Sequence, residues 1–261
     1  MGKATWAEPR DITDLNDCYF YHTMEIPGYG IVHGEWDLRG GEADYLGKIR
    51  LEGKRVLEIG TASGFLCFAM ERMGADVVAY DISDEQELDT VPYPGLDIEQ
   101  HAAEWRKHMR RLNNGFWLAH RAFESRARAL YGTVYEIPED IGRFDVCTFG
   151  SVLLHVRDPF LALQRAASHV EEAIVVTDVV PKLRGKIIAA VELLTDSRLV
   201  RFVPNARKMG APETWWHFTP RMISECLQIL GFSNIAISYH RQRCGIGTAK
   251  LYTVVGRRAG T

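Results

Sequence analysis

Seven strand-like runs alternate with helical stretches along this chain, and that alternation constrains the fold more than any other feature. Apolar, β-branched runs separated by helices are typical of a mostly parallel sheet covered on both faces. The runs span residues 54–60, 75–81, 127–133, 144–150, 171–180, 234–240 and 250–257. Only RQRCGIGTA separates the last two, which is shorter than a crossover helix of about a dozen residues, so these two should form an antiparallel hairpin. The sequence therefore predicts an α/β fold.

The remaining segments predict how the chain is organised around this sheet. Residues 1–50 precede the first strand and should form an N-terminal cover, while residues 51–261 form the main domain. Two insertions interrupt that domain near 82–114 and 181–218, each after the end of a strand. In open α/β sheets ligands bind at the carboxyl ends of the strands, so the cover and the insertions should build a substrate pocket.

The stretch VLEIGTASG at 56–64 joins an apolar strand to a helix through two glycines, Gly60 and Gly64. Glycine allows a tight turn and a close approach of the backbone to a ligand, and the helix that follows offers free N–H groups. The next strand ends in Asp81, whose carboxylate can accept hydrogen bonds from both hydroxyls of a ribose. A polar ligand that contains a ribose is expected here.

This stretch does not match a dinucleotide fingerprint, because Ala62 and Phe65 stand where GxGxxG requires glycines. Glu58, two residues before Gly60, instead matches the acidic residue that serves the amino acid part of S-adenosylmethionine in class I methyltransferases. The sequence resembles that superfamily over about residues 50–257, and the terminal hairpin agrees with it. The resemblance implies a seven-stranded Rossmann-like sheet and S-adenosyl-L-methionine as cofactor.

A narrower resemblance is carried by three segments, SVLLHVRDPFLAL (151–163), NARKMGAPETWW (205–216) and HGEWDLR (33–39). They look like motifs of the tRNA wobble-uridine methyl and carboxymethyl transferases, a family that also includes stand-alone methyltransferases of small molecules. Carboxymethyl-transferring members have tyrosine where this chain has Leu154, and an apolar side chain cannot hydrogen-bond the extra carboxylate of their donor. Plain S-adenosylmethionine is therefore expected.

The motifs and the resemblance together predict a set of cofactor-binding residues. Trp36 and Arg39 are placed over the cofactor, with Arg39 near the methionine carboxylate. The full set is Trp36, Arg39, Glu58, Gly60, Thr61, Gly64, Asp81, Ile82, Thr133, Val134 and Gly150.

His155 follows the fourth strand, beside the expected position of the transferred methyl group. A hydroxyl is a poor nucleophile until a base removes its proton, and histidine is the commonest such base near neutral pH. His155 is the candidate catalytic base, with a purely structural hydrogen bond in this turn as the alternative. Asp158, which precedes Pro159, is expected to cap the next helix.

Trp215, Trp216 and His217 lie in the second insertion and are candidates for a flat wall that binds the substrate. Packing of the insertion against the sheet explains the two tryptophans equally well. The basic stretch 104–112 reads as a solvated helix face rather than a phosphate site. No histidine, cysteine or acidic spacing is characteristic of a metal, so no metal is expected.

Composition excludes several classes of protein. Apolar residues make up 46% and charged residues 25%, which rules out a disordered or low-complexity chain. The net charge of -3 provides no general attraction to nucleic acid or anionic membrane. The five cysteines have no metal spacing and should be reduced, and no run approaches the roughly 20 apolar residues of a membrane span. A cytoplasmic protein is expected.

Together these features predict an S-adenosylmethionine-dependent O-methyltransferase that acts on a hydroxyl of a small hydroxylated metabolite, a saccharide or natural product. The alternative is a tRNA wobble-uridine modifying methyltransferase. Whether oxygen or nitrogen accepts the methyl group stays open at the level of sequence. A non-catalytic relative is disfavoured because Gly60 and Asp81 are intact.

Overall fold

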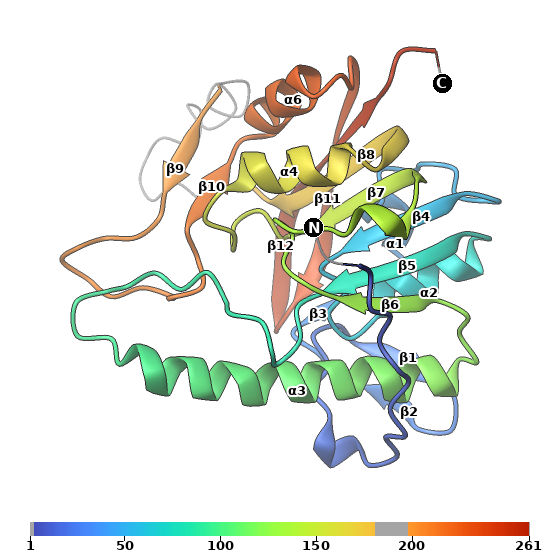
Figure 1. Ribbon diagram of the computed structural model, residues 1–261, viewed down its shortest axis with the longest axis vertical. Coiled ribbons are helices and arrows are strands. Elements are labelled where there is room, and N and C mark those ends of the chain that lie inside the picture. Colours follow the sequence, from blue (N-terminus) through green and yellow to red (C-terminus); the bar gives the residue numbers. More distant parts are fainter. Residues whose placement is uncertain (1–2, 181–197, 261) are drawn as a thin grey trace.

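The computed structural model describes residues 3–180 and 198–260. Within these residues, eight strands form one sheet in the order β3-β11-β12-β8-β7-β4-β5-β6 (Figure 1). In that order they are β3 (Trp36–Asp37), β11 (Asn234–Cys244), β12 (Gly247–Arg257), β8 (Val170–Val179), β7 (Phe144–Gly150), β4 (Arg55–Ile59), β5 (Asp76–Asp81) and β6 (Arg128–Tyr131). Strands β4 to β8 are parallel to one another, whereas β12 lies antiparallel between β8 and β11.

All seven predicted strands are present, and the terminal hairpin is confirmed by the antiparallel pairing of β11 with β12. The predicted count of seven is wrong, because β3 adds an eighth strand at the edge of the sheet, where Asp37 lies opposite Arg243 and Trp36 opposite Cys244. A strand of two residues has no periodicity that a sequence pattern could reveal. This strand pairs with β11, which lies far along the chain. An ion pair of 3.0 Å between Arg243 and Asp37 reinforces the pairing.

Helices cover both faces of the sheet, so the central strands are buried on both sides (Figure 1). Helices α1 (Glu42–Tyr45), α2 (Phe65–Arg72) and α3 (Ile98–Ala122) share one core with Val56 of β4. Helices α4 (Pro159–Ala167) and α6 (Pro220–Ile229) share the other core with the next residue, Leu57. Successive side chains of a strand point to opposite faces, which explains why these strands are continuously apolar.

The predicted cap of α4 is confirmed. The Asp158 carboxylate accepts a hydrogen bond from the Leu161 N–H at 2.9 Å, and Pro159 occupies the first turn. Helix α6 begins in the same way, since the Thr219 hydroxyl accepts from the Met222 N–H before Pro220. Both helices are therefore started by local backbone chemistry.

The N-terminal segment runs from one edge of the sheet, beside β6, to the opposite edge, where β3 lies. The Ala7 N–H donates to the Ala129 carbonyl, which extends the sheet beside β6. Further on, after the short helix η1 (Leu15–Asp17), the Tyr19 N–H donates to a carbonyl of α3. This close approach needs Gly115, where a Cβ would lie 2.5 Å from the Tyr19 carbonyl oxygen. The hairpin of β1 (Met24–Ile26) and β2 (Gly30–Val32) follows.

The two insertions pack against each other. The Val91 N–H donates to the Pro212 carbonyl at 2.7 Å, and Val91, Tyr93 and Trp215 share a small apolar cluster. The second insertion contains the antiparallel pair β9 (Val200–Phe202) and β10 (Trp216–Phe218), and its residues 181–197 lie outside the described residues. A short helix, η2 (Glu139–Ile141), precedes β7.

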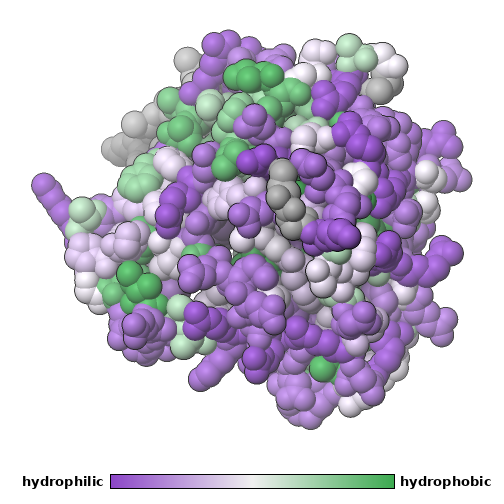
Figure 2. Space-filling model, in the orientation of Figure 1, coloured by the Kyte–Doolittle hydropathy of each residue, from purple (hydrophilic) through white to green (hydrophobic). Residues whose placement is uncertain are grey.

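The surface is mostly hydrophilic, with hydrophobic side chains gathered in the upper part of the view, over α4, α6 and β9 (Figure 2). Exposed members of these elements include Phe160, Phe202 and Ile229. The five cysteines are unpaired, as expected. In the described part of the chain, no helix is long and apolar enough to cross a membrane.

Candidate functional site

The loop after β4 lies where the order of the strands reverses, with β5 and β6 on one side of β4 and β7 and β8 on the other. Gly60 has φ +79° and Gly64 has φ +88°, so both need the freedom of glycine. A Cβ at Gly60 would lie 2.4 Å from Cγ2 of Val152. The loop therefore packs directly on the turn after β7, at the position where open α/β sheets bind their ligands.

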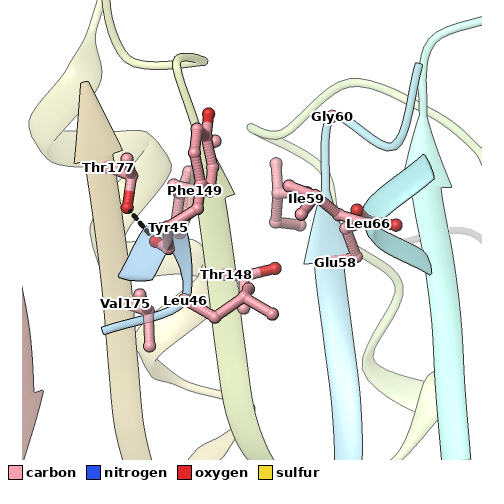
Figure 3. Close-up of a pocket in the computed structure, with 11 residues that line it drawn as sticks. Tyr45, Leu46, Glu58, Ile59, Gly60, Leu66, Thr148, Phe149, Val175 and Thr177 are labelled. Atoms are coloured by element: carbon pink, nitrogen blue, oxygen red, sulfur yellow. Dashed lines mark hydrogen bonds between the residues drawn. The ribbon is translucent and has the colours of Figure 1, made fainter. Parts of the chain in front are cut away.

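A pocket opens between the carboxyl ends of β4 and β7 (Figure 3). Figure 3 shows Glu58, Ile59 and Gly60 on one side and the ends of β7 and β8 on the other. Tyr45 stands on the β8 side, where the Thr177 hydroxyl donates to the Tyr45 carbonyl at 2.6 Å. The lining residues are Tyr45, Leu46, Glu58, Ile59, Gly60, Leu66, Thr148, Phe149, Gly150, Val175 and Thr177.

Two carboxyl groups stand at the β4 and β5 ends of this region. Asp81 accepts hydrogen bonds from the Ala62 N–H at 2.7 Å and from the Ile82 N–H at 2.8 Å, one on each oxygen. A carboxylate has about four lone-pair sites, so each oxygen keeps room for a further donor such as a ribose hydroxyl. Burial raises the pKa of Asp81 to about 6, although both N–H groups oppose this rise.

Glu58 is 3% exposed and accepts a hydrogen bond of 2.6 Å from the Thr61 hydroxyl. Burial raises the pKa of Glu58 to about 8, the bond from Thr61 opposes the rise, and the negative charge of Asp81 adds to it. The loop thus brings Glu58, Thr61 and Asp81, three of the predicted cofactor-binding residues, close together. Cationic and hydroxyl-bearing ligand groups would both suit this acidic corner.

Ile82, Thr133 and Val134 follow the adjacent strands β5 and β6. The Gly132 N–H donates to the Asp81 carbonyl, and the Thr133 carbonyl accepts from the Tyr80 hydroxyl at 2.9 Å. Val134 is buried in the core shared with α4 and α6. These contacts hold the ends of the two strands side by side next to Asp81.

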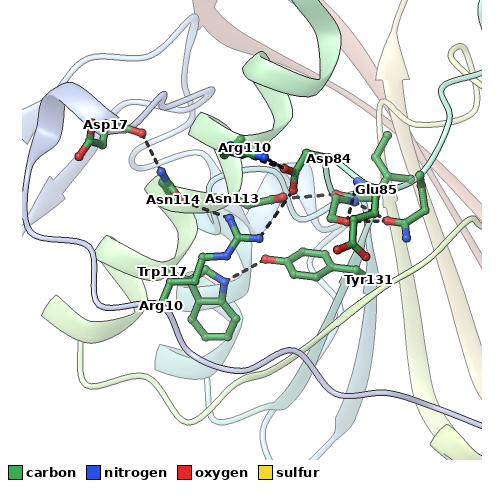
Figure 4. A network of polar contacts seen from close by, with 12 residues as sticks. Arg10, Asp17, Asp84, Glu85, Arg110, Asn113, Asn114, Trp117 and Tyr131 are labelled. Atoms are coloured by element: carbon green, nitrogen blue, oxygen red, sulfur yellow. Dashed lines mark hydrogen bonds and ion pairs between the residues drawn. The ribbon is translucent and has the colours of Figure 1, made fainter. Parts of the chain in front are cut away.

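A polar network fixes the segment after Ile82 (Figure 4). Asp84 forms ion pairs with Arg110 of α3 at 2.8 Å and with Arg10 of the N-terminal segment at 3.8 Å. Arg10 also donates to the Asn114 side chain, and the Trp117 indole donates to the Tyr131 hydroxyl. Arg110 belongs to the basic stretch 104–112, so part of that stretch holds the fold together.

Trp36 and Arg39, the two predicted cofactor-binding residues in the N-terminal segment, have different surroundings. The Trp36 backbone N–H donates to the Tyr21 carbonyl. Arg39 is not brought to the central pocket: its guanidinium pairs with Asp37 at 2.8 Å, and the residue lines a groove between β1 and α2. The aromatic residues that line the pocket are instead Tyr45 and Phe149, and no motif singled out either of them.

His155 lies in the turn after β7, where its backbone N–H donates to the Val152 carbonyl. Its Nδ1 lies 2.7 Å from the Glu213 carbonyl oxygen. A carbonyl can only accept, so Nδ1 carries the proton and Nε2 keeps its lone pair. Burial lowers the pKa of His155, while the Glu213 carbonyl opposes this effect. The imidazole is therefore held neutral and in one tautomer.

The second insertion is attached to the same turn. The backbone N–H groups of Trp215 and Trp216 both donate to the Leu154 carbonyl. Their indoles donate to the carbonyls of Asp89 and Arg157. Trp215 is 9% exposed, so most of its surface is packed against other residues, as the packing alternative expects. His217 lies in β10 opposite Arg201.

Asp178 is a further acidic residue at this edge of the sheet, near the end of β8, and it was not predicted. It is 6% exposed, and burial raises its pKa to about 7. The signal available in the sequence was a single acid inside the otherwise apolar stretch AIVVTDVV.

Comparison with known proteins identifies the type of enzyme. The family model of the methyltransferase domain matches residues 40–237. The chain belongs to this methyltransferase family. This methyltransferase has no significant match among curated protein sequences.

Solved structures share the fold of the methyltransferase at low sequence identity. The N-terminal domain of EvdMO1, determined with SAH and D-fucose, has a TM-score of 0.52 and 19% identity, with 94% of this chain and 92% of that chain covered. Magnesium protoporphyrin IX methyltransferase (ChlM) from Synechocystis PCC 6803 with bound SAM has a TM-score of 0.51 and 14% identity, covering 85% and 78%. The 1,6-didemethyltoxoflavin-N1-methyltransferase of Burkholderia thailandensis has a TM-score of 0.52 and 15% identity, covering 85% and 77%.

These similarities confirm the Rossmann-like class I methyltransferase fold. The free acceptor positions on Asp81 and the buried acid Glu58 fit the ribose and amino acid parts of S-adenosylmethionine.

Proposed function

We propose that this methyltransferase transfers a methyl group from S-adenosyl-L-methionine to a hydroxyl of a small hydroxylated metabolite, with His155 as the general base. The observation that carries the proposal is the state of His155. The bond from Nδ1 to the Glu213 carbonyl leaves Nε2 as a proton acceptor, and burial favours the neutral ring. A neutral imidazole with a free lone pair on Nε2 can remove the proton from the hydroxyl of an acceptor.

The donor supplies a methyl group on a positively charged sulfur. Asp81 would accept hydrogen bonds from its ribose hydroxyls, and Glu58 would hold its amino group. His155 Nε2 would take the proton of the acceptor hydroxyl, whose oxygen receives the methyl group that the donor supplies. The N-terminal segment, with Tyr45 beside Gly150, excludes water from the pocket. Trp216 and His217 form part of the acceptor wall.

A sugar or a similar polyhydroxylated natural product is the preferred acceptor. The EvdMO1 domain, which the chain matches over 94% of its length, was crystallised with D-fucose. The toxoflavin enzyme is an N1-methyltransferase, so this fold also serves nitrogen acceptors. The presence of a neutral base favours oxygen, since a hydroxyl needs deprotonation more than a neutral amine does.

The tRNA wobble-uridine alternative has less support. The side chain of Leu154 is apolar, and the net charge of -3 does not attract nucleic acid. Two of the basic groups on α3, those of Arg110 and Arg111, bind Asp84 and backbone carbonyls instead. We place the reaction in the cytoplasm, where the unpaired cysteines would remain reduced.

The test is methyl transfer from labelled donor to D-fucose, D-glucose, catechol, phenol, aniline and a tRNA transcript. Transfer to a sugar or phenol supports the proposal, whereas transfer to aniline or tRNA alone contradicts it.

A second measurement tests the base. In His155→Asn the amide can still donate to the Glu213 carbonyl but cannot take a proton. The variant should lose about 10²–10⁴-fold in kcat with donor affinity unchanged. Wild-type activity should rise with pH through a pKa below the ordinary histidine value and then stay level. If His217→Ala abolishes turnover while His155→Asn keeps most of it, the base is misassigned.

A further inference from the structure

Asp89, in the first insertion, is bound to the turn that carries His155. Its carboxylate oxygen Oδ2 accepts the Arg157 backbone N–H at 2.7 Å and also accepts a hydrogen bond from the Tyr135 hydroxyl. The oxygen of that hydroxyl in turn accepts the Asp158 backbone N–H at 3.1 Å. The turn is therefore held at the second and third residues after His155.

The first insertion also fixes the Glu213 carbonyl, which is the hydrogen-bond partner of the imidazole. On one side of Glu213, the Val91 backbone N–H donates to the Pro212 carbonyl at 2.7 Å. On the other side, the Trp215 indole donates to the Asp89 backbone carbonyl at 2.6 Å. The same short segment of the first insertion thus holds both the turn that carries the imidazole and the carbonyl that the imidazole binds.

The hydrogen bond between these two groups determines which nitrogen of His155 is protonated. Nδ1 lies 2.7 Å from the Glu213 carbonyl oxygen, so the proton is on Nδ1 and the lone pair is on Nε2. In a neutral imidazole the position of the proton depends on the hydrogen bonds of the ring nitrogens. A turn that moves away from the carbonyl releases Nδ1, and the proton can then pass to Nε2, which can no longer act as a base.

The contact at Asp89 depends on a hydrogen-bond acceptor more than on a charge. The carboxylate is 21% exposed and lies 3.9 Å from the Arg157 guanidinium, which is 62% exposed. Ion pairs as exposed as this one contribute little to stability. The side chain of Asp89 instead provides an oxygen with two lone pairs, one for the backbone N–H of the turn and one for the Tyr135 hydroxyl. Asparagine offers the same kind of oxygen, whereas alanine offers none.

We propose that Asp89 is a positioning residue for the methyl transfer, which holds the turn after β7 so that His155 keeps its bond to Glu213 and its free Nε2. The proposal rests on the proposed function and adds the residue that orients the base. Asp89 acts through His155 and not by contact with the substrate. Its removal should therefore change proton transfer and leave donor binding unchanged.

The first measurement determines the tautomer of His155 and needs no substrate. Nitrogen NMR of the full chain with isotope-labelled histidine distinguishes a ring nitrogen that carries a proton from one that does not, and the spectrum of His155→Asn identifies the signals of His155. The wild type should carry the proton on Nδ1. In Asp89→Ala a large share of His155 should change to the Nε2–H form. Asp89→Asn should restore the wild-type spectrum, because its amide oxygen can accept the same two hydrogen bonds.

The second measurement compares kcat in single and double variants, with the acceptor that the wild type methylates among D-fucose, D-glucose, catechol and phenol. Asp89→Ala should lower kcat by up to about 10²-fold, the effect of a misplaced reacting group. Its calorimetric affinity for S-adenosylhomocysteine should stay within a few-fold of wild type. In the His155→Asn background, Asp89→Ala should lower kcat no further, because its effect passes through the imidazole. A purely structural loss would lower kcat by the same factor in both backgrounds.

The matched control is Asp145→Ala at the opposite end of β7. The Asp145 carboxylate also accepts an arginine backbone N–H at 2.7 Å, that of Arg55. This variant should leave the tautomer of His155 unchanged even if it lowers stability. If Asp89→Ala does not fold, Tyr135→Phe decides in its place, because it lacks the hydroxyl that binds Asp89 and should show the same change to a smaller degree.

An unchanged His155 tautomer in the variant that decides would overturn the inference and leave the proposed function standing. An equal loss of kcat with and without the imidazole would overturn it too. The proposed function fails separately if His155→Asn keeps full activity or if the wild type methylates none of the hydroxyl probes. The inference then fails with it.

Discussion

Replacing Gly60 by alanine tests the contact between the loop after β4 and the turn after β7. The added Cβ would lie 2.4 Å from Cγ2 of Val152, well inside van der Waals contact, and Gly60 already has φ +79°. Two costs therefore add. The left-handed backbone costs about 1–2 kcal/mol for an L-residue, and overpacking costs about 1–3 kcal/mol more.

Gly95 provides a matched control. It has φ +84°, and a Cβ there would meet nothing within 4 Å. Gly95→Ala should show only the backbone cost, partly offset because alanine restricts the unfolded chain by about 0.4–1 kcal/mol. The free energy of unfolding should therefore fall by about 1–3 kcal/mol more in Gly60→Ala than in Gly95→Ala.

Urea denaturation of both variants measures this difference. In the background Val152→Ala the clashing Cγ2 is absent and the next atom, Cβ, is 3.8 Å away. The cost of Gly60→Ala should then fall to that of Gly95→Ala. Because the loop also lines the pocket where we propose that the donor binds, affinity for S-adenosylhomocysteine should weaken in Gly60→Ala and recover in the double variant. Equal costs for Gly60→Ala and Gly95→Ala would refute the reasoning.

Two further predictions concern the acidic corner. Asp81→Ala should weaken binding of S-adenosylhomocysteine by about 1–3 kcal/mol and also destabilise the unliganded protein, because the Ala62 and Ile82 N–H groups lose their acceptor. Calorimetry that finds unchanged affinity in a folded variant would remove the assignment. The raised pKa of Glu58, about 8, leaves its carboxyl group protonated at pH 7. Pairing with the ligand's amino group favours the ionised carboxylate. Ligand binding should therefore release a proton, and the affinity should increase as pH rises through 8. Calorimetry in buffers of different ionisation enthalpy measures this release, which should vanish in Glu58→Gln, and a wild type that releases none would contradict the pairing.

Local chemistry made the loop after β4 and the end of β5 predictable from the sequence. The turn at Gly60 needs a positive φ, and Asp81 ends a strand whose apolar pattern is visible in the chain. The cap at Asp158 and the short connection of the terminal hairpin are local too. In each case a few neighbouring residues determine the conformation, so a pattern within them is sufficient.

Features that depend on contacts between distant segments could not be predicted from a local sequence pattern. The two-residue strand at Trp36–Asp37 exists only because β11 is its neighbour, and Arg39 turns to Asp37 rather than to the central pocket. The narrower family resemblance did not help here, because it matched motifs and not contacts.

The amino-acid sequence alone determined the parallel strands, the terminal hairpin and the glycine turn after β4, because apolar periodicity and backbone conformation are local properties. Only the tertiary structure decided the protonation of His155, since its Nδ1 meets a carbonyl from Glu213 in a separate insertion. The same holds for the raised pKa of Asp178, which is caused by burial in the folded protein. Burial and electrostatic environment arise when segments far apart in the chain pack together, and no single segment contains that information.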